Sequence, residues 1–308
     1  MKTKKEIEVE IFRKVYPELT SFEHTDKPDF ICSYNQIKFG VEVTQLFINE
    51  SDARLSFIPN YSHSLLEGPN YKHRKDKLHL KTGKVKIINE KGVELLFTNG
   101  IIQKLPNAVG FRKILYSCLS VKNKSTLDYT KSLFHYNLII NDNCHLFSRS
   151  AKTNLIELLF DESIILELAK SPFNEVFFVT MIEHAEFCIR LRRLLILSRI
   201  FQLSAVFEQN GIFQNELDEF VQAIVEFLSL QGFHVHYEDN SSNFVIGDNL
   251  YSISIDKQLE VDQYPDGSLS KKYPLFSSIE LLPAELYKKL ISDLEPMNFE
   301  INGIEEYI

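Results

Sequence analysis

Two carboxylates in an apolar hairpin constrain this chain more than any other feature. Residues 27–47 read KPDFICSYNQIKFGVEVTQLF, where a short turn separates two apolar runs, Phe30–Cys32 and Val41–Phe47. This pattern predicts a β-hairpin. Asp29 stands at the start of the first strand, and Glu42 lies inside the second. A carboxylate within such a strand is costly to bury unless something pairs with it.

Two interpretations of these carboxylates are open. A hydrated divalent cation held by two carboxylates is one partner that would justify their position. The alternative is a turn-flanking Asp29 and an edge-strand Glu42 that both face solvent. The spacing alone does not choose between them.

The hairpin resembles a known family. PDF, a turn and then GVEVTQ is similar to the core motif of the PD-(D/E)XK nuclease superfamily, which has an Asp at a strand start and Glu-x-Lys on the next strand. Pro28, Asp29 and Glu42 match this motif, whereas Thr44 stands where the lysine is expected. The resemblance implies a restriction-endonuclease-like fold and a nuclease that uses Mg²⁺ or Mn²⁺, with Asp29 and Glu42 as metal ligands.

A third acid lies on the first predicted helix. Residues 4–16, KKEIEVEIFRKVY, have helical periodicity, and Glu8 falls near the middle of the apolar arc, with Ile11, Phe12 and Val15 at i+3, i+4 and i+7. The superfamily often carries an acidic residue there that points at the metal site, so the resemblance implies this role for Glu8. The alternative is that Glu8 lies in a solvated first turn, where the helix dipole favours an acid.

A later helix offers a substitute for the missing lysine. Residues 106–131 keep helical spacing and contain Lys122 and Lys124 in SVKNKSTLDY. Relatives with Glu-x-Thr often have such a helix, and their lysine is thought to have migrated to it. The resemblance therefore implies Lys122 or Lys124 as the catalytic lysine, with Lys122 ahead because it follows the apolar spacing. A lysine stem is long enough to reach from either element. The alternative is two solvent-facing lysines.

Charge is unevenly distributed along the chain. The net charge of −8 argues against a nucleic-acid partner, because binding needs phosphate neutralisation. However, Tyr71–Lys91 contains eight Lys and Arg residues against two acids, whereas Ile212–Asp262 contains ten acids against one Lys. The first half is thus basic enough to track a DNA backbone. The alternative is a solvated helix face.

The remaining totals describe an ordinary globular chain of 308 residues with 44% hydrophobic residues. No apolar run reaches the roughly 20 residues that span a bilayer, and the N-terminus does not resemble a signal peptide. Four cysteines are scattered without CxxC spacing, which predicts free thiols and a cytoplasmic location. No P-loop, zinc cluster or dinucleotide fingerprint occurs.

The element order predicts an α/β fold with a mixed sheet flanked by helices. We expect a helix, the hairpin, an irregular excursion over 48–105, a helix, a strand, a helix and an apolar strand at 175–181. We place the nuclease-like domain at residues 1–184. A helical connection from Ala185 and a small α+β domain would occupy 185–308.

The sequence therefore leads to two functional hypotheses. The first is a Mg²⁺-dependent endonuclease that hydrolyses phosphodiester bonds, with DNA as the favoured substrate and a restriction or phage-defence setting. The second is a catalytically inactive nuclease-fold protein that binds nucleic acid or a protein partner, which the missing Glu-x-Lys lysine favours. No membrane partner is expected, and a homodimer stays open.

Overall fold

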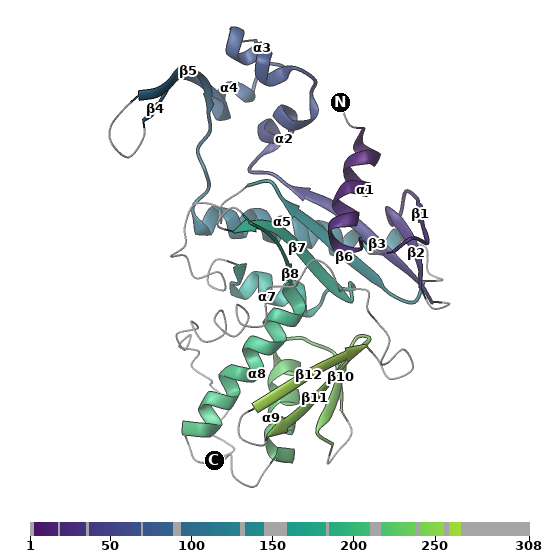
Figure 1. The fold of residues 1–308 in the computed structure, drawn as a ribbon. Helices are drawn as coiled ribbons and strands as arrows, with labels where there is room; N and C mark the ends of the chain where they lie inside the picture. The colour runs from purple at the N-terminus through teal and green to yellow at the C-terminus, as the bar shows by residue number, and fades with distance from the viewer. Residues whose placement is uncertain are drawn as a thin grey trace.

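A six-stranded mixed sheet forms the centre of the molecule (Figure 1). The computed structural model describes residues 3–17, 19–34, 37–68, 70–88, 94–129, 133–144, 159–182, 185–209, 217–237, 241–255 and 259–265. The sheet has the order β1 (Phe22–His24), β2 (Phe30–Tyr34), β3 (Ile37–Leu46), β6 (Tyr136–Asp142), β7 (Glu175–Ile182) and β8 (Ala185–Arg190). Strands β3, β6 and β7 are parallel to one another, and the other neighbouring pairs are antiparallel. The predicted mixed α/β class is confirmed.

Helices cover both faces of this sheet, because its strands send alternate apolar side chains to each face. On one face α1 (Lys4–Val15) packs its apolar stripe against Val41 and Val43 of β3. On the other face α5 (Ala108–Ser125) and α7 (Glu162–Ala169) bury their stripes in a second, larger core. Figure 1 shows α1 in front of the sheet and α5 behind it. Glu42, between Val41 and Val43, therefore faces α5.

The hairpin forms where it was predicted. Phe30 of β2 is opposite Val41 of β3, so Asp29 lies one residue before the paired strand. Gly40 allows a close approach here, because a Cβ atom at this position would lie 2.5 Å from Tyr136 and 2.8 Å from Pro28. The ring of Pro28 thus packs onto β3, next to Asp29 and the start of β2.

The excursion between β3 and α5 is a folded unit, which we call the inserted module (residues 49–102). It contains α2 (Glu50–Phe57), α3 (Tyr61–Glu67), α4 (Asp76–His79) and the antiparallel pair β4 (Lys81–Ile88) and β5 (Glu94–Ile102). The irregular excursion predicted over residues 48–105 was therefore wrong, since three short helices and a strand pair form there.

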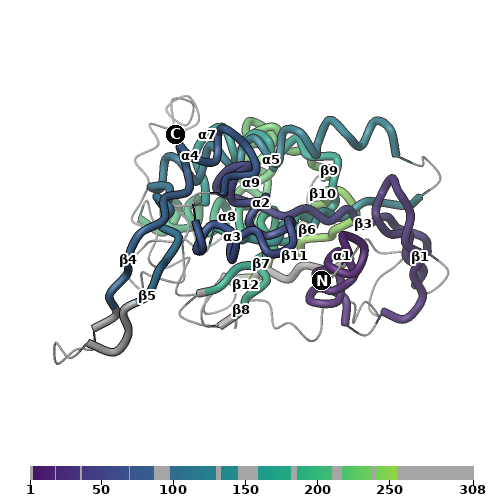
Figure 2. Tube along the Cα trace, turned by 90° about the horizontal axis from the view of Figure 1, so that it is seen from above, coloured from purple at the N-terminus to yellow at the C-terminus, as the bar shows by residue number. Residues whose placement is uncertain are grey.

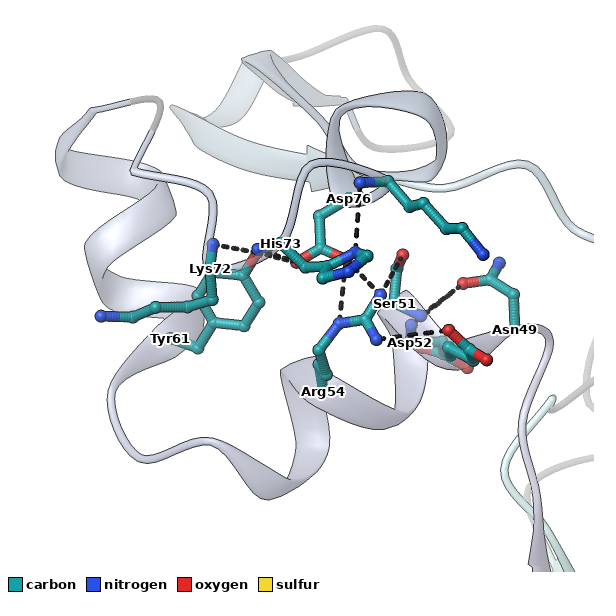
Figure 3. Close-up of polar contacts among 10 residues, drawn as sticks. Asn49, Ser51, Asp52, Arg54, Tyr61, Lys72, His73 and Asp76 are labelled. Atoms are coloured by element: carbon teal, nitrogen blue, oxygen red, sulfur yellow. Dashed lines mark hydrogen bonds and ion pairs between the residues drawn. The ribbon is translucent and has the colours of Figure 1, made fainter.

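A buried aspartate holds the inserted module together (Figure 3). Asp76 is fully buried, and its carboxylate accepts hydrogen bonds from Arg54 of α2 at 2.6 and 3.0 Å. Its second oxygen accepts from the Tyr61 hydroxyl of α3 at 2.5 Å and from the backbone N–H of His73 at 3.1 Å. Burial alone would raise the pKa of Asp76, but these hydrogen bonds outweigh burial and hold it at about 2.

We expect Asp76→Asn to destabilise the inserted module by about 2 kcal/mol at pH 7, because the folded pKa is about 2 and the ordinary value is 3.8. A depressed pKa gives stability that is complete above about pH 4 and is lost as the pH falls towards 2. Hydrogen exchange across residues 49–102 measures the change. Glu67→Gln on the exposed surface of α3 is the matched control and should leave exchange unaltered.

The chain beyond β7 extends the same core. Helix α8 (Leu191–Gln209) leads to α9 (Leu217–Leu230) and to a four-stranded antiparallel sheet with the order β12-β11-β10-β9. Its strands are β9 (Val235–Tyr237), β10 (Asn243–Ile246), β11 (Asn249–Ile255) and β12 (Leu259–Pro265). Side chains of α9, β10 and β11 belong to the hydrophobic core that lies under α5 and α7.

The region around residue 185 differs from expectation. A helix was predicted from Ala185, but residues 185–190 form β8, which pairs with β7 and lengthens the central sheet. β7 accordingly lies one strand in from the edge of the sheet. The domain division at residue 184 stays a prediction.

The sequence also led to expectations about the cysteines and about membrane-spanning helices. All four cysteines are free thiols, as predicted. Within the described ranges, none of the helices combines the length and apolar character needed to cross a membrane.

Candidate active site

Asp29 is held in place by the hairpin itself. Its side chain is 8% exposed, and its Oδ2 accepts a hydrogen bond from the backbone N–H of Val43 at 2.8 Å. Burial, together with the negative charges of Glu42 and Glu8, raises the pKa of Asp29 to about 6 against the opposing effects of the Val43 N–H and Lys122. The three predicted carboxylates are thus close enough for their charges to act on Asp29.

Glu42 contacts Lys122, the lysine that the resemblance placed on a later helix. Lys122 Nζ lies 2.6 Å from Glu42 Oε1, although the two residues are 80 positions apart. The contact follows from the geometry of α5, where Lys122 continues the buried stripe of Leu115 and Leu119 towards β3. The other oxygen of Glu42, Oε2, is buried and has no hydrogen-bond partner among the described residues.

Glu8 is buried on α1, as its place in the apolar arc predicted. Its Oε1 lies 3.1 Å from Lys4 Nζ, and its Oε2 lies 3.0 Å from His24 Nε2. The hydrogen bond to Glu8 and its charge raise the pKa of Lys4, and Asp29 and Glu42 add to this effect. Both oxygens of Glu8 are therefore engaged by basic side chains.

Tyr129 adds a hydroxyl to the same region. The residue is buried, and its hydroxyl lies 3.2 Å from Ser125 Oγ near the end of α5. Burial raises the pKa of Tyr129, and the charge of Glu42, a hydrogen-bonding interaction with Glu42 and the charge of Asp29 raise it further. The phenol is consequently neutral at physiological pH and can donate a hydrogen bond.

Lys124, the second lysine expected at the site, lies elsewhere. It is exposed, and two positions along a helix turn its side chain about 200° away from Lys122. Sequence reasoning also missed two neighbours of Glu8. The i,i+4 spacing of Lys4 and Glu8 could have indicated the first, whereas no periodic pattern pointed to His24 on the three-residue strand β1.

Metal ligation by Glu8, Asp29 and Glu42 stays a prediction. In the part of the chain that the structure describes, no group of three or more His, Cys, Asp or Glu side chains is arranged to hold a metal ion. Lys4 and His24 engage the two carboxylate oxygens of Glu8. Asp29 and Glu42 remain as a pair.

This pair fits a hard divalent cation. The buried Oε2 of Glu42 lacks a hydrogen bond, and burial together with the charges of Glu42 and Glu8 raises the pKa of Asp29. A divalent cation would give Oε2 of Glu42 a partner and would favour the ionised form of Asp29. Mg²⁺ commonly uses one or two carboxylates and completes its shell with waters and substrate phosphates, so two ligands suffice.

Comparisons with known proteins found no relative: no family model, no curated protein and no solved structure matches the chain. A functional assignment therefore depends on the residues and their geometry.

Proposed function

We propose that the chain is a metal-dependent nuclease of the PD-(D/E)XK type, with Asp29, Glu42 and Lys122 as its catalytic residues. The contact between Lys122 and Glu42 carries the proposal, because it supplies an ammonium group beside the motif glutamate where Thr44 replaces the usual lysine. The antiparallel hairpin, the following helix α5 and the parallel strand β6 are consistent with a restriction-endonuclease-like core.

Each residue has a distinct part in this proposal. Asp29 and Glu42 would hold Mg²⁺ or Mn²⁺, which when bound supplies a Lewis acid for the phosphoryl oxygen and an acidified water. The Val43 N–H fixes the orientation of Asp29. The Lys122 ammonium offsets negative charge that develops on the scissile phosphate.

Two further groups support the site. Tyr129 offers a neutral hydroxyl as a donor to a phosphate oxygen. Glu8 positions Lys4, whose exposed ammonium adds positive charge beside the carboxylates. The favoured substrate is DNA and the setting is restriction or phage defence, both of which follow from the superfamily resemblance.

A second candidate is a catalytically inactive protein of the same fold that binds nucleic acid or a protein partner. Ammonium groups of Lys4 and Lys122 already lie against two of the three carboxylates. Such pairs neutralise the acids without a metal, which favours a binding role.

A cleavage assay separates these candidates. We expect wild-type protein to cut supercoiled plasmid or single-stranded DNA with Mg²⁺ or Mn²⁺, and Asp29→Ala and Glu42→Ala to lower the rate on the order of 10²-fold or more. Single-stranded RNA tests the choice of DNA. If the wild-type protein leaves all three substrates intact with both metals, the nuclease proposal is overturned in favour of the binding role.

A further inference from the structure

Exposed Lys and Arg side chains gather in one stretch of the inserted module, residues 71–86, which we call its positive surface. All seven Lys and Arg side chains between Tyr71 and Lys86 are exposed. The one acid in this span, Asp76, is fully buried and ion-paired with Arg54, so it contributes no negative charge to the surface. The chain as a whole carries a net charge of −8, which makes this concentration of positive charge local to the module.

The positive side chains come from elements that are fixed relative to one another. Asp76 joins α2, α3 and the turn before α4, and Figure 3 shows Arg54, Tyr61 and His73 converging on it. β4 follows α4 directly and pairs with β5 along its length. Lys84 and Lys86 are two positions apart on β4, so their side chains lie on the same face of the strand, about 7 Å apart.

The strand pair that carries part of the positive surface projects away from the central sheet. Figures 1 and 2 both show β4 and β5 extending outward from the molecule, on the side away from β1. This arrangement suits contact with a long ligand that also reaches the central sheet. A small anion would need a closed pocket rather than an extended row of side chains.

The chemistry of the surface favours nucleic acid over a lipid membrane. A membrane-binding helix combines basic residues with a broad apolar face. Helix α4 has four residues, and Leu78 is the one large hydrophobic side chain exposed among residues 71–86. Lysine and arginine without an apolar face are instead typical of contacts to phosphate, which position a duplex without reading its sequence.

We infer that the inserted module is a docking surface for the phosphate backbone of duplex DNA, separate from the carboxylate site. The choice of DNA rests on the proposed nuclease function, whereas the preference for a polyphosphate rests on the module's own charge. The module would set affinity and salt dependence, and the carboxylates would set the rate of cleavage.

Fluorescence anisotropy of a labelled duplex, with the full chain in EDTA, tests this inference. Lys75→Gln/Lys84→Gln removes one positive charge directly before α4 and one from β4. We expect this double variant to bind on the order of tenfold more weakly at 0.1 M salt, and its log K against log salt slope to fall in magnitude by about 2. Two duplexes of unrelated sequence should respond equally.

Matched variants keep the result interpretable. Lys113→Gln/Lys170→Gln removes the same charge from exposed positions on α5 and at the end of α7, and it should bind like wild type. Lys75→Arg/Lys84→Arg keeps the charge and should retain the wild-type slope. Circular dichroism of each variant reports whether it is folded.

Three outcomes overturn the inference: absent duplex binding by the wild type, equal weakening by the two glutamine double variants, or binding to anionic vesicles with none to duplex. EDTA prevents cleavage, so the result is independent of the nuclease proposal. Binding through the module without any cleavage in the metal assay would refute the nuclease proposal alone. Cleavage without module-dependent binding would refute this inference alone.

Discussion

Asp29→Asn is expected to stabilise the protein at pH 8 while it removes a proposed metal ligand. The folded carboxyl has a pKa of about 6 against an ordinary 3.8, so its ionisation at pH 8 costs about 2–3 kcal/mol of folding free energy. An asparagine avoids this cost, and its amide oxygen can still accept the Val43 N–H. Urea denaturation at pH 8 should show the gain directly.

The pH dependence of this stability gain shows whether ionisation of Asp29 is its cause. Because the folded pKa is raised, the stability that the protonated carboxyl gives is complete below about pH 4 and is lost as the pH rises through 6. The asparagine variant should therefore converge with the wild type near pH 4. Asp128→Asn, at an exposed position near the end of α5, is the control and should give no gain at pH 8. An equal gain at every pH would contradict the prediction.

The same pair of proteins tests cation binding without any cleavage. A ligand that binds only the folded state stabilises it by RT ln(1 + [L]/Kd), which is about 2.7 kcal/mol at a hundredfold excess over Kd. Mg²⁺ or Mn²⁺ should raise the melting temperature of the wild type at pH 8 and leave that of Asp29→Asn unaltered. An equal rise in both proteins would place the cation elsewhere.

The sequence predicted the parts of the site that local patterns encode. Alternation of apolar residues defined the hairpin of Asp29 and Glu42, and helical spacing placed Glu8 on the buried side of α1. The same spacing favoured Lys122 over Lys124, and the structure brings Lys122 to Glu42. In each case the side chain follows a periodic stripe whose direction is a property of the helix or strand alone.

The parts that sequence reasoning missed depend on distant contacts. Helices α2 and α3 have eight and seven residues, too few for a clear periodic signal, and they are stabilised by the buried Asp76 with Arg54 and Tyr61. Strand β8 was predicted as helix because it runs directly into the apolar helix α8, and its pairing with β7 decides otherwise. Asn49, which caps α2, was the one local signal for that helix.

Lys122→Met is expected to destabilise the fold and to remove catalysis. The substitution leaves the Glu42 carboxylate, 10% exposed, without its 2.6 Å partner. An uncompensated buried carboxylate of this kind costs about 3 kcal/mol. Glu42→Gln removes the charge, so the double variant Lys122→Met/Glu42→Gln should recover most of the stability lost by Lys122→Met. Both variants should lose cleavage, because each lacks the ammonium group at the phosphate and the double variant also lacks the proposed metal ligand Glu42.

Lys124→Met makes the matched comparison, with the same substitution two residues along the same helix. Lys124 is exposed, so this variant should stay within about 0.5 kcal/mol of the wild type and keep its cleavage rate. Stability restored in the double variant would show that the stability lost in Lys122→Met comes from the unpaired Glu42 carboxylate, and cleavage by Lys122→Met with Glu42 intact tests the catalytic part of Lys122. Cleavage lost in Lys124→Met but kept in Lys122→Met would transfer the catalytic role to Lys124. The Lys122–Glu42 contact would then be an ion pair of the fold alone.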